Sequence, residues 1–305
     1  MSAEILPWLW IPVTIWAAFA QTLRNATQRH LVAELGTLGA TLVRFLYGLP
    51  FAFLWLLALV AAGLPVPAPN TAFVFWVAEG ALAQIVATAL LLQVMTERNF
   101  ALGVAYSKTE ILQVALFSAV LLGDPVTTAA ALAMAAGTLG VLLLSPADKE
   151  RPLRAMVMGW TTRSALLGLA SGACFALSAV GYRGAALALD GPSFLSAAGY
   201  TLVWAQVLQT AALGGWLLWT QREVVMRVIR AWRASLFAGF MGTAASAGWF
   251  TAMAIEPAAH VRTLGLVELL FSYVVSRRLF RERLTRLEIA GIALLLVGVV
   301  VVSLR

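Results

Sequence analysis

The sequence contains little charge and almost no cysteine, and both scarcities exclude whole classes of protein. Asp, Glu, Lys and Arg make up only 11% of its 305 residues, whereas 61% are hydrophobic and the mean hydropathy is +0.88. So few polar side chains cannot cover a water-soluble globule of this size. The single cysteine, Cys174, excludes an intrachain disulfide and a cysteine-based metal cluster. The composition therefore predicts a protein whose solvent is lipid.

Sequence motifs of enzymes are equally scarce. The two histidines, His30 and His260, lie far apart, and neither an HExxH nor a GxSxG spacing occurs. A GxxxxGK[ST] phosphate-binding loop is also missing, so we expect no ATP hydrolysis by this chain. We expect no catalytic residues, no metal, no cofactor and no nucleic-acid partner. An integral-membrane enzyme acting on lipid-linked substrates is kept as the alternative function.

Long apolar runs dominate what is present. Proline, glycine, asparagine and charged clusters divide the chain into ten runs of about 20 residues, the length at which a helix crosses a bilayer. The runs are continuous rather than alternating, which favours helices over the strands of a membrane barrel. No basic residue precedes the first run, so we expect that run to stay as a transmembrane helix. The expected helices are 6–28, 36–61, 71–95, 101–122, 126–145, 164–188, 194–219, 234–254, 258–277 and 285–303.

The two halves of the chain repeat each other. Shifting the sequence by 158 residues superposes Glu110 on Glu268, and five runs lie on each side of the longest polar connection, 145–163. Because five is an odd number, the second copy enters the membrane upside down relative to the first. We therefore expect an all-α integral membrane protein with ten transmembrane helices. They would form two inverted five-helix repeats, residues 1–150 and 151–305, around a central cavity.

The basic residues predict the orientation in the cell inner (plasma) membrane. Fifteen of the 21 Lys and Arg residues lie in or beside alternate connections between the runs, and the six others are Arg24, Arg44, Lys108, Arg183, Arg262 and Arg305. Basic connections face the cytoplasm as a rule. This bias predicts that both termini lie outside.

Charged side chains inside the runs are the first candidate functional residues. An ionised group at the bilayer centre costs roughly 2.5 to 3.5 kcal/mol on insertion scales, so it usually faces protein or a watery cavity. Glu79, Glu110 and Glu268 lie near mid-depth, and Arg44 lies inside another run. Glu110 and Glu268 either bind a substrate amine or carry protons, or they form internal ion pairs that hold the repeats in register. Arg44 is either a structural or gating ion-pair member or a carboxylate clamp, and Lys108 is a candidate partner of Glu79.

Polar and aromatic side chains also recur at helical spacing on four of the runs. Tyr106, Glu110 and Gln113 follow i, i+4 and i+7, so they share one face of their helix. Such stripes either fill the helix bundle or line a shared cavity that suits an amphipathic ligand. Beyond the charged candidates, the residues expected to bind substrate or couple transport are Tyr106, Gln113, Gln21, Asn25, Trp76, Phe175, Ser178, Tyr182 and Trp249.

The end of each half carries a recurring order of residues. In VELLFSYVVSRRLFRERLTRLEIAGIALLLVGVVVVS, an early acid, an acid at a turn and a glycine-rich last helix follow one another as Glu268, Glu282, Gly291 and Gly298. The first half has the same order from Glu110 onward. This pattern resembles the closing helix pair of EamA-type carriers of the drug/metabolite transporter superfamily. The resemblance covers essentially the whole chain and implies a transporter, although members of that family usually keep both termini in the cytoplasm.

These expectations describe a secondary transporter. It would move small organic metabolites across the inner membrane by alternating access, with amino acids or related compounds, aromatic or hydrophobic ones among them, as cargo and export as the direction. Its partners would be the small-molecule substrate, the lipid bilayer and, if a carboxylate couples transport, protons.

Overall fold

The computed structural model describes residues 6–97, 107, 110–124, 128, 131–132, 134–136, 139, 163–189, 193–280, 290, 293–294 and 297. These residues form helices joined by short turns and connections, with no strand among them. Five segments are long and apolar enough to cross a membrane: Trp8–Ala61, Thr71–Thr96, Leu166–Ala188, Phe194–Thr220 and Ala258–Val275. The prediction of an all-helical, multi-pass membrane protein is therefore confirmed. The ten-helix inverted repeat stays a prediction.

The chain packs as two compact units. The first unit comprises Met1–Ile85 and Leu177–Pro257, and the second comprises Val86–Ala176 and Ala258–Arg305. Each unit thus combines segments from both halves of the sequence. The expected repeat boundary near residue 150 lies outside the described residues, so the division into repeats also stays a prediction.

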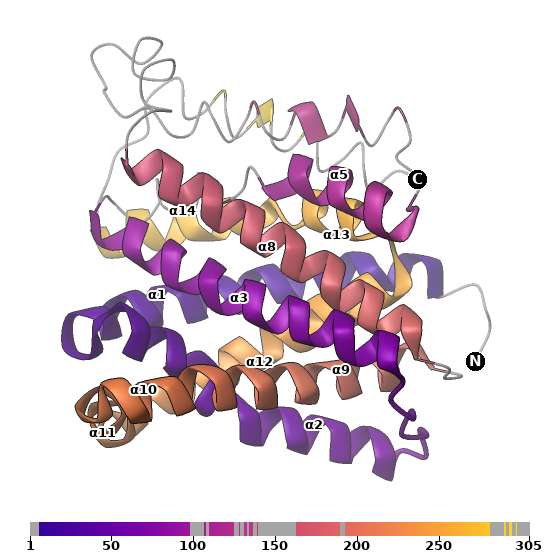
Figure 1. Ribbon diagram of the computed structural model, residues 1–305. Helices are drawn as coiled ribbons and strands as arrows, with labels where there is room; N and C mark the ends of the chain where they lie inside the picture. Colours follow the sequence, from indigo (N-terminus) through magenta and orange to yellow (C-terminus); the bar gives the residue numbers. More distant parts are fainter. Residues whose placement is uncertain are drawn as a thin grey trace. The chain divides into compact units, whose positions relative to one another are not determined.

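Helix α1, Leu6–Leu46, consists of two arms that turn back on each other. Gly36 interrupts it with φ 71° and ψ 171°, a backbone conformation that glycine adopts without steric cost. The Gln28 side chain donates a hydrogen bond of 2.7 Å to the carbonyl of Ala40, so the two arms lie side by side. Figure 1 shows the reversal at one end of α1. The expected pair of N-terminal helices is therefore present.

The boundaries of these two helices differ from the predicted ones. The first was expected to end at residue 28, but the arm continues because Leu31 and Leu35 are buried at i and i+4 while His30 and Glu34 are exposed. The second arm ends at a turn, and a separate helix, α2, runs over Leu49–Ala61. Pro50 lies in the first turn of α2, where a missing amide hydrogen costs least.

Asn70 links two helices by hydrogen bonds. They are α3, Thr71–Glu97, and α8, Arg163–Ala188. The side-chain oxygen of Asn70 accepts a hydrogen bond of 2.8 Å from the amide of Phe73, which caps the start of α3. Its side-chain nitrogen donates a bond of 2.6 Å to the carbonyl of Ala188 at the end of α8. One asparagine therefore satisfies backbone groups at both helix ends.

Glycines allow α3 and α8 to approach closely in the first unit. A Cβ added at Gly80 would lie 3.0 Å from the ring of Tyr182, and one added at Gly184 would lie 2.7 Å from the ring of Trp76. Each aromatic ring therefore lies directly against the backbone of the other helix. Close backbone approach of this kind is how helices associate when lipid provides no hydrophobic drive.

A connection predicted from the sequence forms a helix of its own. After α9, Phe194–Gln209, the π-helical turn η1, Thr210–Gly214, and α10, Gly215–Thr220, the chain enters α11, Arg222–Arg230. The charged side chains of α11 are exposed, whereas its valines are buried. The sequence analysis interpreted this segment as a connection, because charged residues are frequent in loops between membrane helices. The core cluster that receives the valines is formed by Leu42, Phe45, Leu213, Leu217, Val224 and Val225.

The remaining described helices are α12, Trp232–Ile255, in the first unit, and α5, Glu110–Leu122, α13, Ala258–Leu264, and α14, Val267–Phe280, in the second. The expected single helix 258–277 is broken by a turn between α13 and α14. Backbone amides in this turn donate hydrogen bonds to carbonyls three residues earlier, which is the pattern of a 3₁₀ turn. Most of the expected helices 126–145 and 285–303 lies outside the described residues.

Candidate functional site

Two arginines of α1 form the centre of a buried polar cluster in the first unit. Arg24 is 1% exposed and Arg44 is 2% exposed, which is exceptional for charged side chains. Arg24 donates hydrogen bonds of 2.7 and 3.2 Å to the Asn25 side-chain oxygen, and Arg44 donates one of 3.5 Å to the Ser246 hydroxyl. A Cβ at Gly242 would lie 3.3 Å from Arg24 Cδ and 3.4 Å from Arg44 Cγ. Both side chains therefore converge on one glycine of α12.

The cluster continues along α1 and α12 through a glutamine and a tryptophan. The indole nitrogen of Trp249 donates a hydrogen bond of 2.9 Å to the side-chain oxygen of Gln21. We name this group the arginine cluster; its members are Gln21, Arg24, Asn25, Arg44, Ser246 and Trp249. Four of the residues singled out from the sequence, Gln21, Asn25, Arg44 and Trp249, thus lie in one place.

A second group of buried polar side chains, the amide–tyrosine cluster, consists of Gln84, Tyr182 and Gln209. The Gln209 side chain donates hydrogen bonds of 2.8 Å to the Gln84 oxygen and 2.8 Å to the Tyr182 hydroxyl, and that hydroxyl lies 3.1 Å from the Gln84 oxygen. The Tyr182 ring also packs on Phe250, with ring centroids 4.3 Å apart. Gln209 is the last residue before the π-helical turn, an irregularity that frequently accompanies functional positions.

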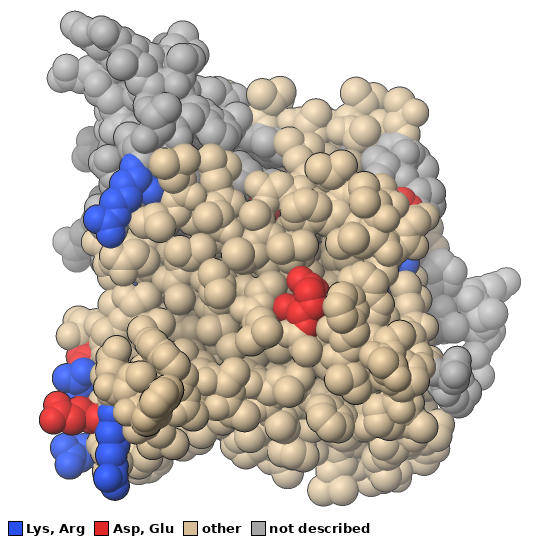
Figure 2. Space-filling view, in the orientation of Figure 1, with Lys and Arg blue, Asp and Glu red and all other residues tan. Residues whose placement is uncertain are grey.

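Glu79 lies on α3, next to the amide–tyrosine cluster. Its carboxylate contacts Gly181 of α8, and its Oε2 atom is buried without a hydrogen-bond partner among the described residues. Figure 2 shows a small acidic area surrounded by uncharged side chains on the face where α3 runs in Figure 1. Trp76, one turn earlier on α3, packs on α8 as described above. Lys108, the candidate partner of Glu79, lies outside the described residues.

The two glutamates that superpose in the repeat belong to the second unit. Glu110 of α5 lies 3.6 Å from Arg262 of α13, measured from Oε1 to Nη1, and both side chains are almost fully buried. Glu268 is 0% exposed and lies in the first turn of α14, directly after the broken part of the helix. Gln113 is half-buried on α5, and Tyr106 lies outside the described residues. The Glu110–Arg262 contact is the geometry of an internal ion pair.

Two further candidates lie on α8, Phe175 in the second unit and Ser178 in the first. Both are buried, and a Cβ at Gly80 would lie 3.3 Å from the carbonyl oxygen of Ser178. Both therefore lie in the packed interior, and Ser178 lies at the close contact between α3 and α8. Their predicted part in substrate binding remains a prediction.

Comparisons with known proteins relate the C-terminal part of the chain to a family. Residues 162–304 match the model of the EamA-like transporter family, part of the drug/metabolite transporter superfamily. Over these residues the chain is similar to that family. The resemblance inferred from the sequence is confirmed for these residues, which contain α8 to α14, including Tyr182, Trp249 and Glu268.

A likeness in fold extends over the whole chain. One solved structure, described only as a crystal structure of a protein, matches with a TM-score of 0.65 and 18% sequence identity. The match covers 98% of this chain and 96% of the other. No curated protein matches the chain. At this identity the likeness concerns the fold alone.

Sequence analysis missed several residues of these clusters. Gln84 and Gln209 are isolated amides inside apolar runs, as Gln21 is, but they belong to no stripe of polar and aromatic residues that would have singled them out. Arg24 and Arg262 are visible as intramembrane charges. The partner of Arg262 could not be inferred from spacing, because Arg262 meets a residue more than 150 positions away.

Proposed function

We propose that the protein is a secondary transporter that moves small organic metabolites across a membrane by alternating access. The observation that carries this proposal is the arginine cluster, in which Arg24 and Arg44 are buried within membrane-spanning helices. An arginine at the bilayer centre costs roughly 2.5 to 3.5 kcal/mol even on insertion scales, and such residues typically mark a substrate or ion pathway. A protein that only provides a scaffold has no need of them.

The broken helix in the second unit supports the same function. Discontinuous helices near mid-membrane are typical of secondary transporters, where freed backbone groups and helix ends bind substrate or coupling ions. Glu268 lies in the first turn after the break, and Glu110 with Arg262 is part of the same unit. Carboxylates in this position are candidates for coupling transport to protons.

The chemistry of the two polar clusters favours cargo with both a polar and an aromatic or apolar part. The arginine cluster combines guanidinium, amide and hydroxyl groups with the indole of Trp249, and the amide–tyrosine cluster combines amides with the tilted, contacting rings of Tyr182 and Phe250. Amino acids and related metabolites have this mixed character. We therefore propose amino acids or related compounds as substrates and export across the inner membrane as the direction.

Transport by purified protein in liposomes tests the proposal. Vesicles preloaded with one unlabelled compound from a panel of amino acids and organic metabolites should take up the same labelled compound by exchange. Arg44→Gln should reduce this exchange to the level of empty vesicles, because it removes a charge from the arginine cluster. Arg233→Gln, which changes an exposed arginine at the start of α12, is the matched control and should exchange like the wild type.

Two results would contradict transport. One is monodisperse, inserted protein that exchanges no compound of the panel above the empty-vesicle level. The other is an Arg44→Gln variant with full exchange, which would remove the arginine cluster from the mechanism. Recovery of a chemically altered compound would support the membrane-enzyme alternative instead.

A further inference from the structure

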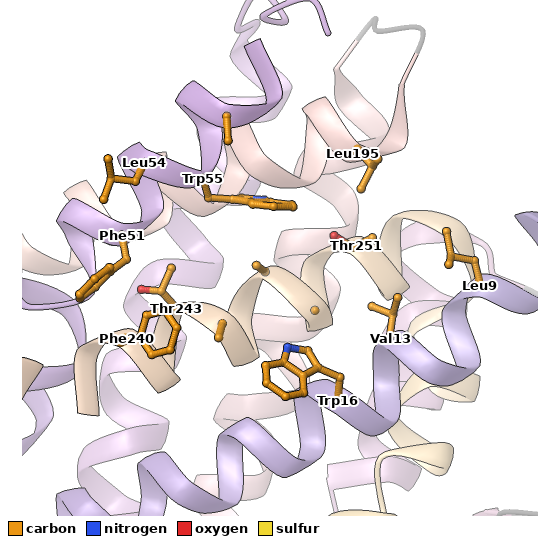
Figure 3. A pocket seen from close by; sticks show the side chains of 14 residues that line it. Leu9, Val13, Trp16, Phe51, Leu54, Trp55, Leu195, Phe240, Thr243 and Thr251 are labelled. Carbon is orange, nitrogen blue, oxygen red and sulfur yellow. The ribbon is translucent and has the colours of Figure 1, made fainter. Parts of the chain in front are cut away.

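An apolar cavity of about 640 Å³ opens between α1, α2, α9 and α12 in the first unit. This volume lies within the ~300 to 1,000 Å³ typical of small-molecule sites. Figure 3 shows an elongated space with Phe51 and Phe240 at one end and Leu9 at the other, and with Trp16 and Trp55 on opposite sides. The lining residues are Leu9, Val13, Trp16, Phe51, Leu54, Trp55, Ala58, Leu195, Phe240, Thr243, Ala244, Ala247, Gly248 and Thr251.

Small, buried or half-buried residues of α12 line the cavity and are here named its floor, and large, exposed residues are named its rim. Ala244, Ala247 and Gly248 follow one another along the floor. Gly248 also lets α1 approach α12, since a Cβ there would lie 2.8 Å from the Cβ of Ala17. The two helices are therefore in contact beneath the cavity, and Trp16 extends past this contact to the rim.

The lining offers almost no polar group to a ligand. Its hydroxyls belong to Thr243 and Thr251, and the Thr243 hydroxyl donates a hydrogen bond of 2.8 Å to the carbonyl of Gly48 and lies 3.4 Å from the Gln206 amide nitrogen. That hydroxyl is therefore used within the protein. A charged or amide-bearing ligand would lose its hydration here without replacement bonds. The lining therefore favours a hydrocarbon ligand.

The rim identifies the source of that hydrocarbon. Trp16, Leu54, Trp55 and Phe240 are 49%, 59%, 37% and 45% exposed, and three of them lie in the candidate membrane span Trp8–Ala61. In a multi-pass membrane protein the exposed apolar side chains of a span contact lipid tails. The cavity is therefore continuous with the lipid-facing surface, and a tail can enter it without crossing water.

We propose that this cavity holds one acyl chain of a bilayer phospholipid. The elongated shape accepts an extended chain, the small floor residues make room for it, and the aromatic side chains flank it. This inference is independent of the transport proposal, because none of the cavity residues belongs to either polar cluster.

Photolabelling of the full-length protein tests the inference without any substitution. The protein is reconstituted in vesicles of palmitoyl-oleoyl phosphatidylethanolamine and phosphatidylglycerol that contain a phosphatidylcholine with a diazirine at the end of one acyl chain. After irradiation, mass spectrometry should locate label on the floor residues Ala244 and Ala247 as well as on the rim. A floor without label in the wild type overturns the proposal.

A cavity-filling variant provides the second test. Ala247→Phe should exclude at least about two methylenes of the chain and lower floor labelling roughly tenfold, because each buried methylene contributes about 0.8 kcal/mol. Ala170→Phe, at an exposed alanine of α8, is the matched control and should leave floor labelling unchanged. Ala244→Leu gives an independent, smaller filling if Ala247→Phe fails to fold.

Two patterns of labelling would contradict the proposed occupant. Unchanged floor labelling in both filling variants would show that the label does not enter the cavity. A floor that becomes labelled only when the protein-to-lipid ratio is lowered would indicate that a second copy of the chain covers the cavity.

Discussion

Replacing Glu110 by glutamine removes one charge of a pair that is almost completely buried in the second unit. The Glu110 and Arg262 side chains are 3% and 6% exposed and approach to 3.6 Å. Two unit charges at this distance interact by about 5 kcal/mol at an effective dielectric constant of ~20. Removal of one partner of a buried pair typically costs about 3 to 5 kcal/mol, because the other charge stays buried. We expect Glu110→Gln to destabilise the protein by an amount in this range.

The two single variants should not be equivalent. In Glu110→Gln the arginine remains charged, since a guanidinium is not deprotonated in proteins. In Arg262→Gln the carboxyl group can take up a proton and so avoid a buried charge. Glu110→Gln should therefore lower the unfolding temperature more than Arg262→Gln does. The double variant should recover most of the loss, because replacing both charges of a buried pair is often close to neutral.

Thermal unfolding of detergent-solubilised protein, followed by the loss of the monodisperse peak, measures these differences. At roughly 2 to 4 °C per kcal/mol for larger domains, the Glu110→Gln shift is on the order of 10 °C. Arg233→Gln, at an exposed arginine, should not shift the transition. Single variants that both unfold like the wild type would refute the ion-pair argument.

Transport by the double variant then separates the two interpretations of Glu110. If Glu110 only holds helices together, a double variant that is as stable as the wild type should also transport like it. If Glu110 carries a proton, the same stable protein should have lost proton-coupled transport. In a stable double variant, retained transport therefore indicates a structural role of Glu110, and lost proton-coupled transport indicates a role in coupling.

Three further predictions follow from single contacts and from the charge pattern. Gly181→Ala should destabilise the protein by about 1 to 3 kcal/mol and so lower the unfolding temperature, because the added Cβ would meet the Glu79 carboxylate and lie 2.9 Å from the backbone of α3. Gly215→Ala is the control and should not lower it, because a Cβ there would have nothing within 4 Å. Gln209→Leu should cost about 1 to 3 kcal/mol in the same assay, because it removes the two buried hydrogen bonds to the Gln84 oxygen and the Tyr182 hydroxyl, and a wild-type transition would contradict this. A reporter fused after Arg305 should give no cytoplasmic signal if both termini lie outside.

Much of the helical architecture could be predicted because apolar runs are bounded by residues with strong local preferences. The expected helix 71–95 corresponds to α3, which begins after the Asn70 cap, and 234–254 corresponds to α12. The break before Glu268 and the π-helical turn after Gln209 could not be predicted, since both lie inside continuous apolar runs. Only tertiary contacts decide where such a run is interrupted.

The candidate site was predictable residue by residue but not as an arrangement. A charge or amide in an apolar run is visible in the sequence, which is why Arg44 and Gln21 were chosen, and Trp249 was chosen from a stripe of polar and aromatic residues at helical spacing. Their partners are not visible, because Arg44 meets Ser246 at a separation of 202 residues and Gln21 meets Trp249 at 228. No local pattern encodes which helices pack together, so the arginine cluster emerges only from the fold.

Helix α12 explains how one element serves both the arginine cluster and the apolar cavity. Gly242, Ser246 and Trp249, at i, i+4 and i+7, face the arginines and glutamine of α1, whereas Phe240, Ala244, Ala247 and Thr251 follow the same spacing on the cavity side. It is rich in glycine, alanine, serine and threonine, and it lies outside the five candidate spans although it is longer than two of them. A helix surrounded by other helices can carry such a composition, because its small and polar residues contact protein rather than lipid. The small residues of α12 therefore let the arginine cluster form on one side of the helix and the cavity on another.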